Sequence, residues 1–177
     1  GGGGSGHSPV KMMNEWGMPT VTLGTLLWKV LSAWKKRGKA CPPVALAGGF
    51  VTEDQVYKGL ALGAPHVGTI ALGRGAMAAA SVGRLVGEAL KEGTVPPEYA
   101  RFGSTVEELF ADLRVLKQIY GDEAAQIPPG ALGVYSYLSR VAVGLQQFMA
   151  LNRKFALAHI GREDLVPLTE HAARATG

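Results

Sequence analysis

Two short apolar segments, residues 44–47 and 67–72, stand out in the pattern of hydrophobic and polar positions, and each ends at a glycine turn. The first is followed by Gly48-Gly49 and the second by Gly73-Arg74. Short apolar runs bounded by proline and glycine are typical of parallel strands that are buried on both faces. We therefore expect these two segments to be adjacent parallel strands.

The stretch between the two segments has a helical pattern with a clear start signal. Thr52, with Gln55 three residues later, has the spacing of a capping box and predicts a helix over residues 53–62 that stops at Gly63. A second helix is predicted over residues 76–90. The resulting order is strand, turn, helix, strand, turn, helix, in which a helix connects the parallel strands.

The last part of the chain carries amphipathic helical patterns. Ser104 and Glu107 have capping-box spacing and predict a helix that runs to about Tyr120. A longer apolar stripe predicts another helix over about residues 132–159. Such stripes usually form a core or a subunit contact, so we expect these helices to pack on the rest of the protein or on a partner.

The two glycine turns are expected to lie together, because the carboxyl ends of parallel strands meet at one edge of a sheet. Glycine lets the backbone approach a phosphate closely, and free N–H groups at such turns attract anions. The alternative is that both are ordinary strand-ending turns and that Arg74 is a solvated loop residue. The pair at this spacing favours a phosphate site.

In (β/α)8 TIM barrels the loops after strands 7 and 8 often bind phosphate. The fold class that we expect is therefore α/β, the C-terminal portion of a TIM barrel with strands 7 and 8 and their flanking helices, followed by an α-helical tail. The barrel part would cover residues 1–92 and the helical extension residues 93–177. A complete barrel needs roughly 200–250 residues, so this chain of 177 residues would be a fragment, one part of an assembly, or a remnant.

Composition narrows the function classes. The chain is 47% hydrophobic and 18% charged, with a net charge of +4, and it lacks a long basic tract interleaved with aromatic residues, so nucleic acid is not expected as a partner. Cys41, the single cysteine, excludes an intrachain disulfide and a cysteine-based cluster. The weakly charged stretch 59–83 contains Pro65 and Arg74 and is a poor membrane span. The four histidines lack metal-ligand spacing. We expect a cytoplasmic protein without a metal or a membrane contact.

The first nine residues are rich in glycine and end in Ser8-Pro9. They could be a flexible Gly-Ser linker or a natural active-site loop. The sequence that follows continues without a junction, which favours the natural loop. His7 could touch a ligand there or be an ordinary loop residue.

With this loop the chain resembles the C-terminal part of the FMN-binding domain of glutamate synthase-related proteins, which has a G-G-x-G-x-S-P loop after strand 6. Gly3-Gly4-Ser5-Gly6-His7-Ser8-Pro9 matches that loop, a helix over 25–37 matches the sixth helix, and the two strand-turn segments match strands 7 and 8. The resemblance covers about residues 1–90 and is looser beyond them.

The resemblance implies an FMN site in which the turns after the two strands hold the phosphate and the N-terminal loop lies near the flavin ring. The cofactor-binding residues that it implies, together with the two turns, are Gly3, Gly4, Ser5, Gly48, Gly49, Phe50, Gly73 and Arg74. The reaction implied is reductive amination of 2-oxoglutarate with ammonia, in which reduced flavin delivers hydride to 2-iminoglutarate in glutamate biosynthesis.

Two departures from the family matter. Large glutamate synthases carry three cysteines after strand 8 that hold an iron–sulfur cluster, and residues 76–87 contain none, so this chain supplies no such cluster and its electron donor is unknown. The family's substrate-binding residues lie on earlier strands, so no catalytic residue is assigned. We expect the chain to be an oxidoreductase only when a partner chain or an N-terminal segment completes it.

Two other functions fit the same turns. An IMP dehydrogenase or an α-hydroxyacid oxidase also ends strands 7 and 8 with glycine turns, but the first needs a nucleophilic cysteine in the matching loop and the second a His-Gly-Ala-Arg stretch before strand 7, and both are absent. A non-catalytic assembly subunit is the third possibility.

Overall fold

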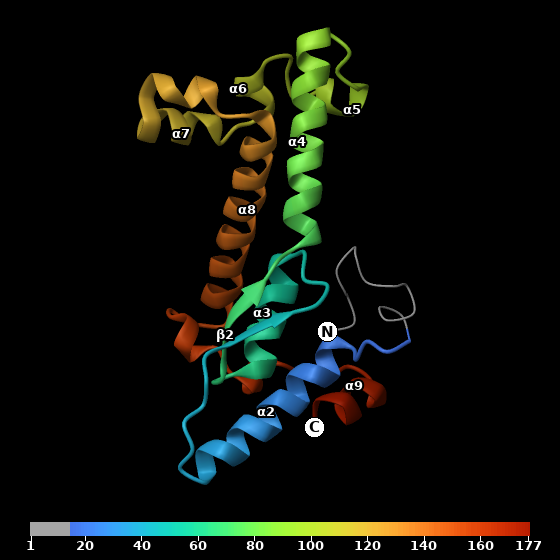
Figure 1. Cartoon of the computed structure of the whole chain (residues 1–177), viewed down its shortest axis with the longest axis vertical. Helices are drawn as coiled ribbons and strands as arrows, with labels where there is room; N and C mark the ends of the chain where they lie inside the picture. Colours follow the sequence, from blue (N-terminus) through green and yellow to red (C-terminus); the bar gives the residue numbers. More distant parts are fainter. Residues whose placement is uncertain (1–14) are drawn as a thin grey trace. The chain divides into compact units, whose positions relative to one another are not determined.

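The computed structural model describes residues 15–177, which divide into two compact units. The first unit contains residues 15–73 together with residues 143–177, and the second contains residues 74–142 (Figure 1). The expected domain boundary after residue 92 falls inside the second unit.

The first unit contains two parallel strands. Strand β1 (Val44–Ala47) pairs with β2 (Val67–Ala71), with Leu46 opposite Ile70 and Ala47 opposite Ala71. The register shifts between Val44 and Ala45. The prediction of two adjacent parallel strands is confirmed.

The barrel prediction is wrong. The chain is 64% helical, and within residues 15–177 the sheet has only the two short strands. The expected burial of both sheet faces also fails, because Ala45, Ala47, Thr69 and Ala71 are exposed. A strand-helix-strand unit with glycine turns is common to all parallel α/β folds, and its spacing does not indicate how many other strands the sheet contains.

Two helices flank the strands in the first unit. Helix α2 (Thr20–Lys36) overlaps the expected 25–37 and ends one residue earlier. It starts five residues earlier, because Pro19 fixes the chain at its first turn and its carbonyl accepts from the Leu23 amide at 2.9 Å. Helix α3 (Glu53–Gly63) matches the expected 53–62, and α2 packs against it (Figure 1). The core of this layer is formed by Leu46, Phe50 and Val67.

The C-terminal segment of the first unit packs back on these helices. It contains two short 3-10 turns, η2 (Leu157–His159) and η3 (Arg162–Asp164), and the final helix α9 (Glu170–Thr176), which lies beside α2. The Arg162 guanidinium stacks over the Trp28 ring at 4.3 Å from its centroid and donates to the Leu62 carbonyl at 2.8 Å and to the Thr176 carbonyl. One side chain therefore joins α2, α3 and α9.

The second unit is entirely helical. Its elements are α4 (Arg74–Glu92), α5 (Pro97–Ala100), α6 (Val106–Leu109), α7 (Leu113–Tyr120), the 3-10 turn η1 (Gly121–Gln126), and the first part of α8 (Pro129–Leu151). Its core contains Val86, Phe110, Leu113, Leu116, Ala124 and Leu132. This core holds α4, α7 and the start of α8 together.

Two helix predictions in the tail need correction. The helix expected from Ser104 to Tyr120 is interrupted, because Phe110 leaves the helical conformation (φ −113°, ψ 75°) and turns into the core. Its capping box uses Thr105 and Glu108, one residue later than expected, with the Glu108 amide donating to the Thr105 hydroxyl at 3.3 Å. The expected helix over 132–159 begins at residue 129 and ends at residue 151, just before a left-handed residue at position 153.

Small residues bring α4 and α8 close together within the second unit. A Cβ placed on Gly83 would lie 2.5 Å from the Pro129 carbonyl oxygen, and one placed on Gly133 would meet the Ala79 carbonyl oxygen. Both neighbours are backbone atoms, so they have no rotamer that could move aside. Only glycine fits at these two positions.

Candidate functional site

The carboxyl ends of β1 and β2 form the candidate site, and the pairing places their turns together. Ala47 and Ala71 are register partners at the ends of the two strands, so the chain leaves both strands at the same edge. Gly48 has φ 139° and Gly49 has φ 80°, values in the region that favours glycine. A Cβ added to Gly49 or Gly73 would meet nothing within 4 Å, so the space beside both residues is open.

The amides of these turns can donate to a ligand. Within residues 15–177, no backbone carbonyl accepts from the amides of Gly49, Phe50 or Gly73. Such amides at the end of parallel strands suit an anion, because they offer donors without the steric bulk of a side chain. The Phe50 ring has a different role: it is 9% exposed and packs in the core with Leu46 and Val67. Of the groups of Phe50, only the amide belongs to the candidate site.

A cavity of about 230 Å³ adjoins the Gly48-Gly49 turn, on the side of α2 and α3. Thr20, the first residue of α2, lines it and donates its hydroxyl to the Gly48 carbonyl at 2.7 Å, which fixes the turn against the helix. Gln55 also lines the cavity, and its side-chain oxygen accepts from the Val51 and Thr52 amides at 2.8 and 3.2 Å. The turn is therefore held from both ends.

Lys58 supplies the cavity's positive charge, and sequence reasoning missed it. Its ammonium pairs with Asp54 at 2.8 Å, four residues earlier on α3. The hydrogen bond from Lys58, followed by one from Thr52, lowers the pKa of Asp54 despite partial desolvation. A cation in the second turn of the helix that follows a strand-ending Gly-Gly is the signal that could have pointed to Lys58.

The acidic first turn of α3 decides which donors could bind an anion. Glu53 and Asp54 stand at the helix N-terminus, where their charges oppose an anionic ligand. The turn amides and Lys58 therefore suit a phosphate, whereas the N-terminus of α3 does not.

Gly3, Gly4 and Ser5, with His7, lie outside the described residues. Gly73 ends the first unit, whereas Arg74 begins α4 in the second unit, so the part of Arg74 in the site stays a prediction.

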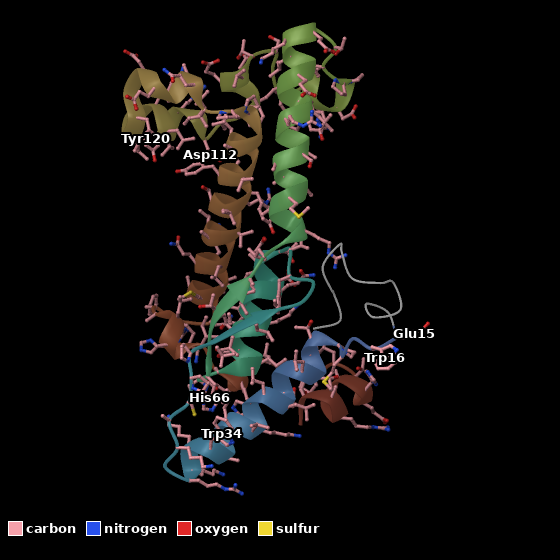
Figure 2. The ribbon with its side chains drawn as sticks, viewed as in Figure 1. Glu15, Trp16, Trp34, His66, Asp112 and Tyr120 are labelled. Atoms are coloured by element: carbon pink, nitrogen blue, oxygen red, sulfur yellow. The ribbon has the colours of Figure 1, made fainter. Side chains whose placement is uncertain are left out.

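A second polar contact lies at the opposite end of the sheet. His66, the residue before β2 (Figure 2), shares a hydrogen bond of 3.1 Å between its Nε2 and the Ser32 hydroxyl on α2. Burial, with a smaller contribution from Lys35, lowers the pKa of His66. Among the described residues, no group of three or more His, Cys, Asp or Glu side chains could hold a metal ion, and no helix is long and apolar enough to cross a membrane.

Comparison with protein-family models, with curated proteins and with solved structures gives no match. The resemblance to the FMN-binding domain of glutamate synthase-related proteins therefore stays a prediction from the sequence.

Proposed function

We propose that the turns after β1 and β2 bind the phosphate group of FMN through their backbone amides. The observation that carries this proposal is the pairing of Ala47 with Ala71, which puts the open turns of Gly49 and Gly73 at one edge of the sheet. The donors suit an anion and the glycines leave room for it, and Lys58, whose ammonium pairs with Asp54 at 2.8 Å, is the cation that lines the cavity. These features fit the phosphate end of the cofactor.

The size of the cavity limits what this part of the chain can hold. Its volume of about 230 Å³ lies below the roughly 300–1,000 Å³ that is usual for pockets that enclose drug-sized ligands. The site therefore suits a phosphate and its nearest atoms but not the flavin ring. The ring and any substrate would need groups beyond those described, from the N-terminal loop or from a partner polypeptide.

Within this proposal the chain contributes to a glutamate synthase-like oxidoreductase. FMN, when bound, supplies hydride transfer to a substrate such as the imine formed from 2-oxoglutarate and ammonia. The part of the described residues is binding and orientation: the turn amides hold one end of the cofactor, and Thr20 and Gln55 hold the first turn in place. Fixing one end of a cofactor restricts where its reactive end can lie.

The test is a comparison of FMN with riboflavin, which lacks the phosphate, by equilibrium dialysis with the full chain. We expect FMN to be retained more strongly, and inorganic phosphate to compete with it. Gly49→Val should remove this difference, because a β-branched residue at φ 80° is strained by roughly 1–2 kcal/mol and its side chain enters the open space.

Gly68→Val is the matched control. Gly68 lies within β2 at an ordinary φ, and a Cβ there meets nothing within 4 Å. This variant should retain FMN as the parent chain does. Equal retention of FMN and riboflavin, or full FMN retention by Gly49→Val, would overturn the proposal.

A non-catalytic assembly role is the second candidate, and a specific observation favours it. Large apolar side chains of the C-terminal segment are exposed, with Phe155 at 83%, Val166 at 77% and Leu168 at 90%. Exposed apolar surface of this kind often marks a protein interface. A concentration-dependent increase in mass by light scattering, lost when Leu168 is changed to Asp, would support assembly, and a monomer at all concentrations would exclude self-assembly.

A further inference from the structure

The second unit contains a separate cavity that the proposed function does not use. Its volume is about 530 Å³, and it lies between α7, η1 and the start of α8. This size falls within the roughly 300–1,000 Å³ range of small-molecule pockets. Its walls are formed chiefly by Leu116, Tyr120, Glu123, Gln126, Ile127 and Tyr135. No residue of this cavity belongs to the phosphate site.

The elements that carry the lining residues are held in place by the core of the second unit. Tyr120 is the last residue of α7 (Figure 2), and Gly121 ends the helix there with φ 57°. Leu116 is 5% exposed in the core of the second unit, and Tyr135 packs against the same core. The two tyrosines are thus attached to elements that a single core holds together, so the cavity needs little rearrangement to receive a ligand.

The charge of the lining selects the kind of ligand. Glu123 is the only formally charged residue among the lining residues, and none of the ion pairs within residues 15–177 involves it. An anion would be repelled by this carboxylate. Glu123 is exposed, so a neutral apolar ligand would gain nothing from its charge, whereas a cation would pair with it.

A cation with apolar substituents satisfies both parts of the lining. Its charge compensates Glu123, and its alkyl groups replace water on Ile127 and Pro128. The faces of tyrosine rings attract ammonium groups, and pockets lined by aromatic rings recognise quaternary ammonium compounds. Tyr120 is 54% exposed, so its ring can be reached from solvent.

We propose that this cavity binds a small organic ammonium compound whose nitrogen carries alkyl groups. Tyr120 and Tyr135 provide the aromatic walls and Glu123 provides the opposite charge. This site is independent of the phosphate site, since the two share no residue and lie in different units.

Choline is the probe, and 3,3-dimethyl-1-butanol, its neutral counterpart of nearly the same shape, is the ligand control. Titration of the full chain by NMR should show choline binding that perturbs the amides around Tyr120 and Glu123, with weaker binding of the neutral compound. Tyr120→Leu should weaken choline binding roughly two- to fivefold, as expected for loss of one cation–π contact of about 0.5–1 kcal/mol. Glu123→Gln should weaken choline but not the neutral compound.

Asp122→Asn is the matched control variant, because it removes one negative charge from η1 at a residue that does not line the cavity. It should leave choline binding unchanged. Equal binding of choline and its neutral counterpart, or equal effects of Asp122→Asn and Glu123→Gln, would overturn the proposal. Binding to phosphatidylcholine vesicles without binding to free choline would also overturn it, because the ligand would then be a lipid surface.

Discussion

Asp164 joins the C-terminal segment to the rest of the first unit, and its removal tests how that segment is held. Its carboxylate accepts from the Tyr57 hydroxyl at 3.0 Å, from the Gly161 amide at 3.0 Å, and from the Lys154 ammonium at 3.2 Å. The side chain is 7% exposed. Burial opposes ionisation of this group, but the three donors together outweigh burial and lower the pKa of Asp164.

The expected cost of Asp164→Ala follows from these contacts. The substitution leaves the buried Tyr57 hydroxyl without its acceptor, which costs about 1–3 kcal/mol. Lys154 keeps a second carboxylate, Glu163 at 3.0 Å, so no charge is left uncompensated. We expect a loss of about 2–3 kcal/mol in the free energy of unfolding, which corresponds to about 4–12 °C in melting temperature for a chain of this size.

Thermal and urea unfolding, followed by circular dichroism, measure this loss. Asp54→Ala is the matched control, because Asp54 also pairs with a lysine but is 36% exposed on α3, and exposed pairs four residues apart contribute only about 0.2–0.5 kcal/mol. Limited proteolysis should also cut Asp164→Ala earlier in the segment after residue 151. A loss no larger than that of Asp54→Ala would refute the reasoning.

Three further outcomes follow from the packing and the pKa shifts. Burial, reinforced by Asp164, raises the pKa of Tyr57 to about 12. The free energy of unfolding that comes from keeping this hydroxyl protonated is complete below about pH 10 and is lost as pH rises from about 10 to about 12. Urea unfolding at different pH values should show this loss, and Tyr57→Phe should reduce it. Burial lowers the pKa of His66, so stability should fall as pH drops below about 6.5 through the folded value, and His66→Gln should flatten this fall in the same assay. Gly133→Ala should destabilise the second unit by about 1–3 kcal/mol, because the added methyl meets a backbone carbonyl, and thermal unfolding equal to that of the parent would contradict this.

The strand-helix-strand core of the first unit could be predicted from local signals. The apolar runs and the glycines after them mark both strands, and Gln55 accepts from the Thr52 amide as the spacing indicates. These features depend on residues that are close in sequence, so a single sequence contains the information.

The barrel and the continuous tail helix could not be predicted correctly, for different reasons. The strand-helix-strand pattern does not indicate how many strands complete a sheet, so the prediction of a barrel goes beyond what the local pattern supports. In the tail, Ser104 and Thr105 are each followed by glutamate three residues later, so the spacing alone does not indicate which one caps, and the burial of Phe110 coincides with the end of α6. Tertiary packing overrides local propensity at such positions.

The candidate site was predictable in part. The glycines of both turns come directly from the sequence, and the strand pairing places them at one edge. Thr20 and Lys58 belong to the same site, but they lie on two different helices. The sequence separation between Thr20 and Gly48 does not predict the hydrogen bond between them.

The most direct test of the phosphate site is a two-dimensional amide NMR titration of the full chain with FMN and with riboflavin at millimolar concentration, where weak binding is still visible. The proposal predicts that FMN shifts the amides of Gly49, Phe50 and Gly73 most, and that riboflavin leaves them in place. Unchanged positions of these three amides in FMN, or equal shifts with riboflavin, would contradict a phosphate site at the ends of β1 and β2.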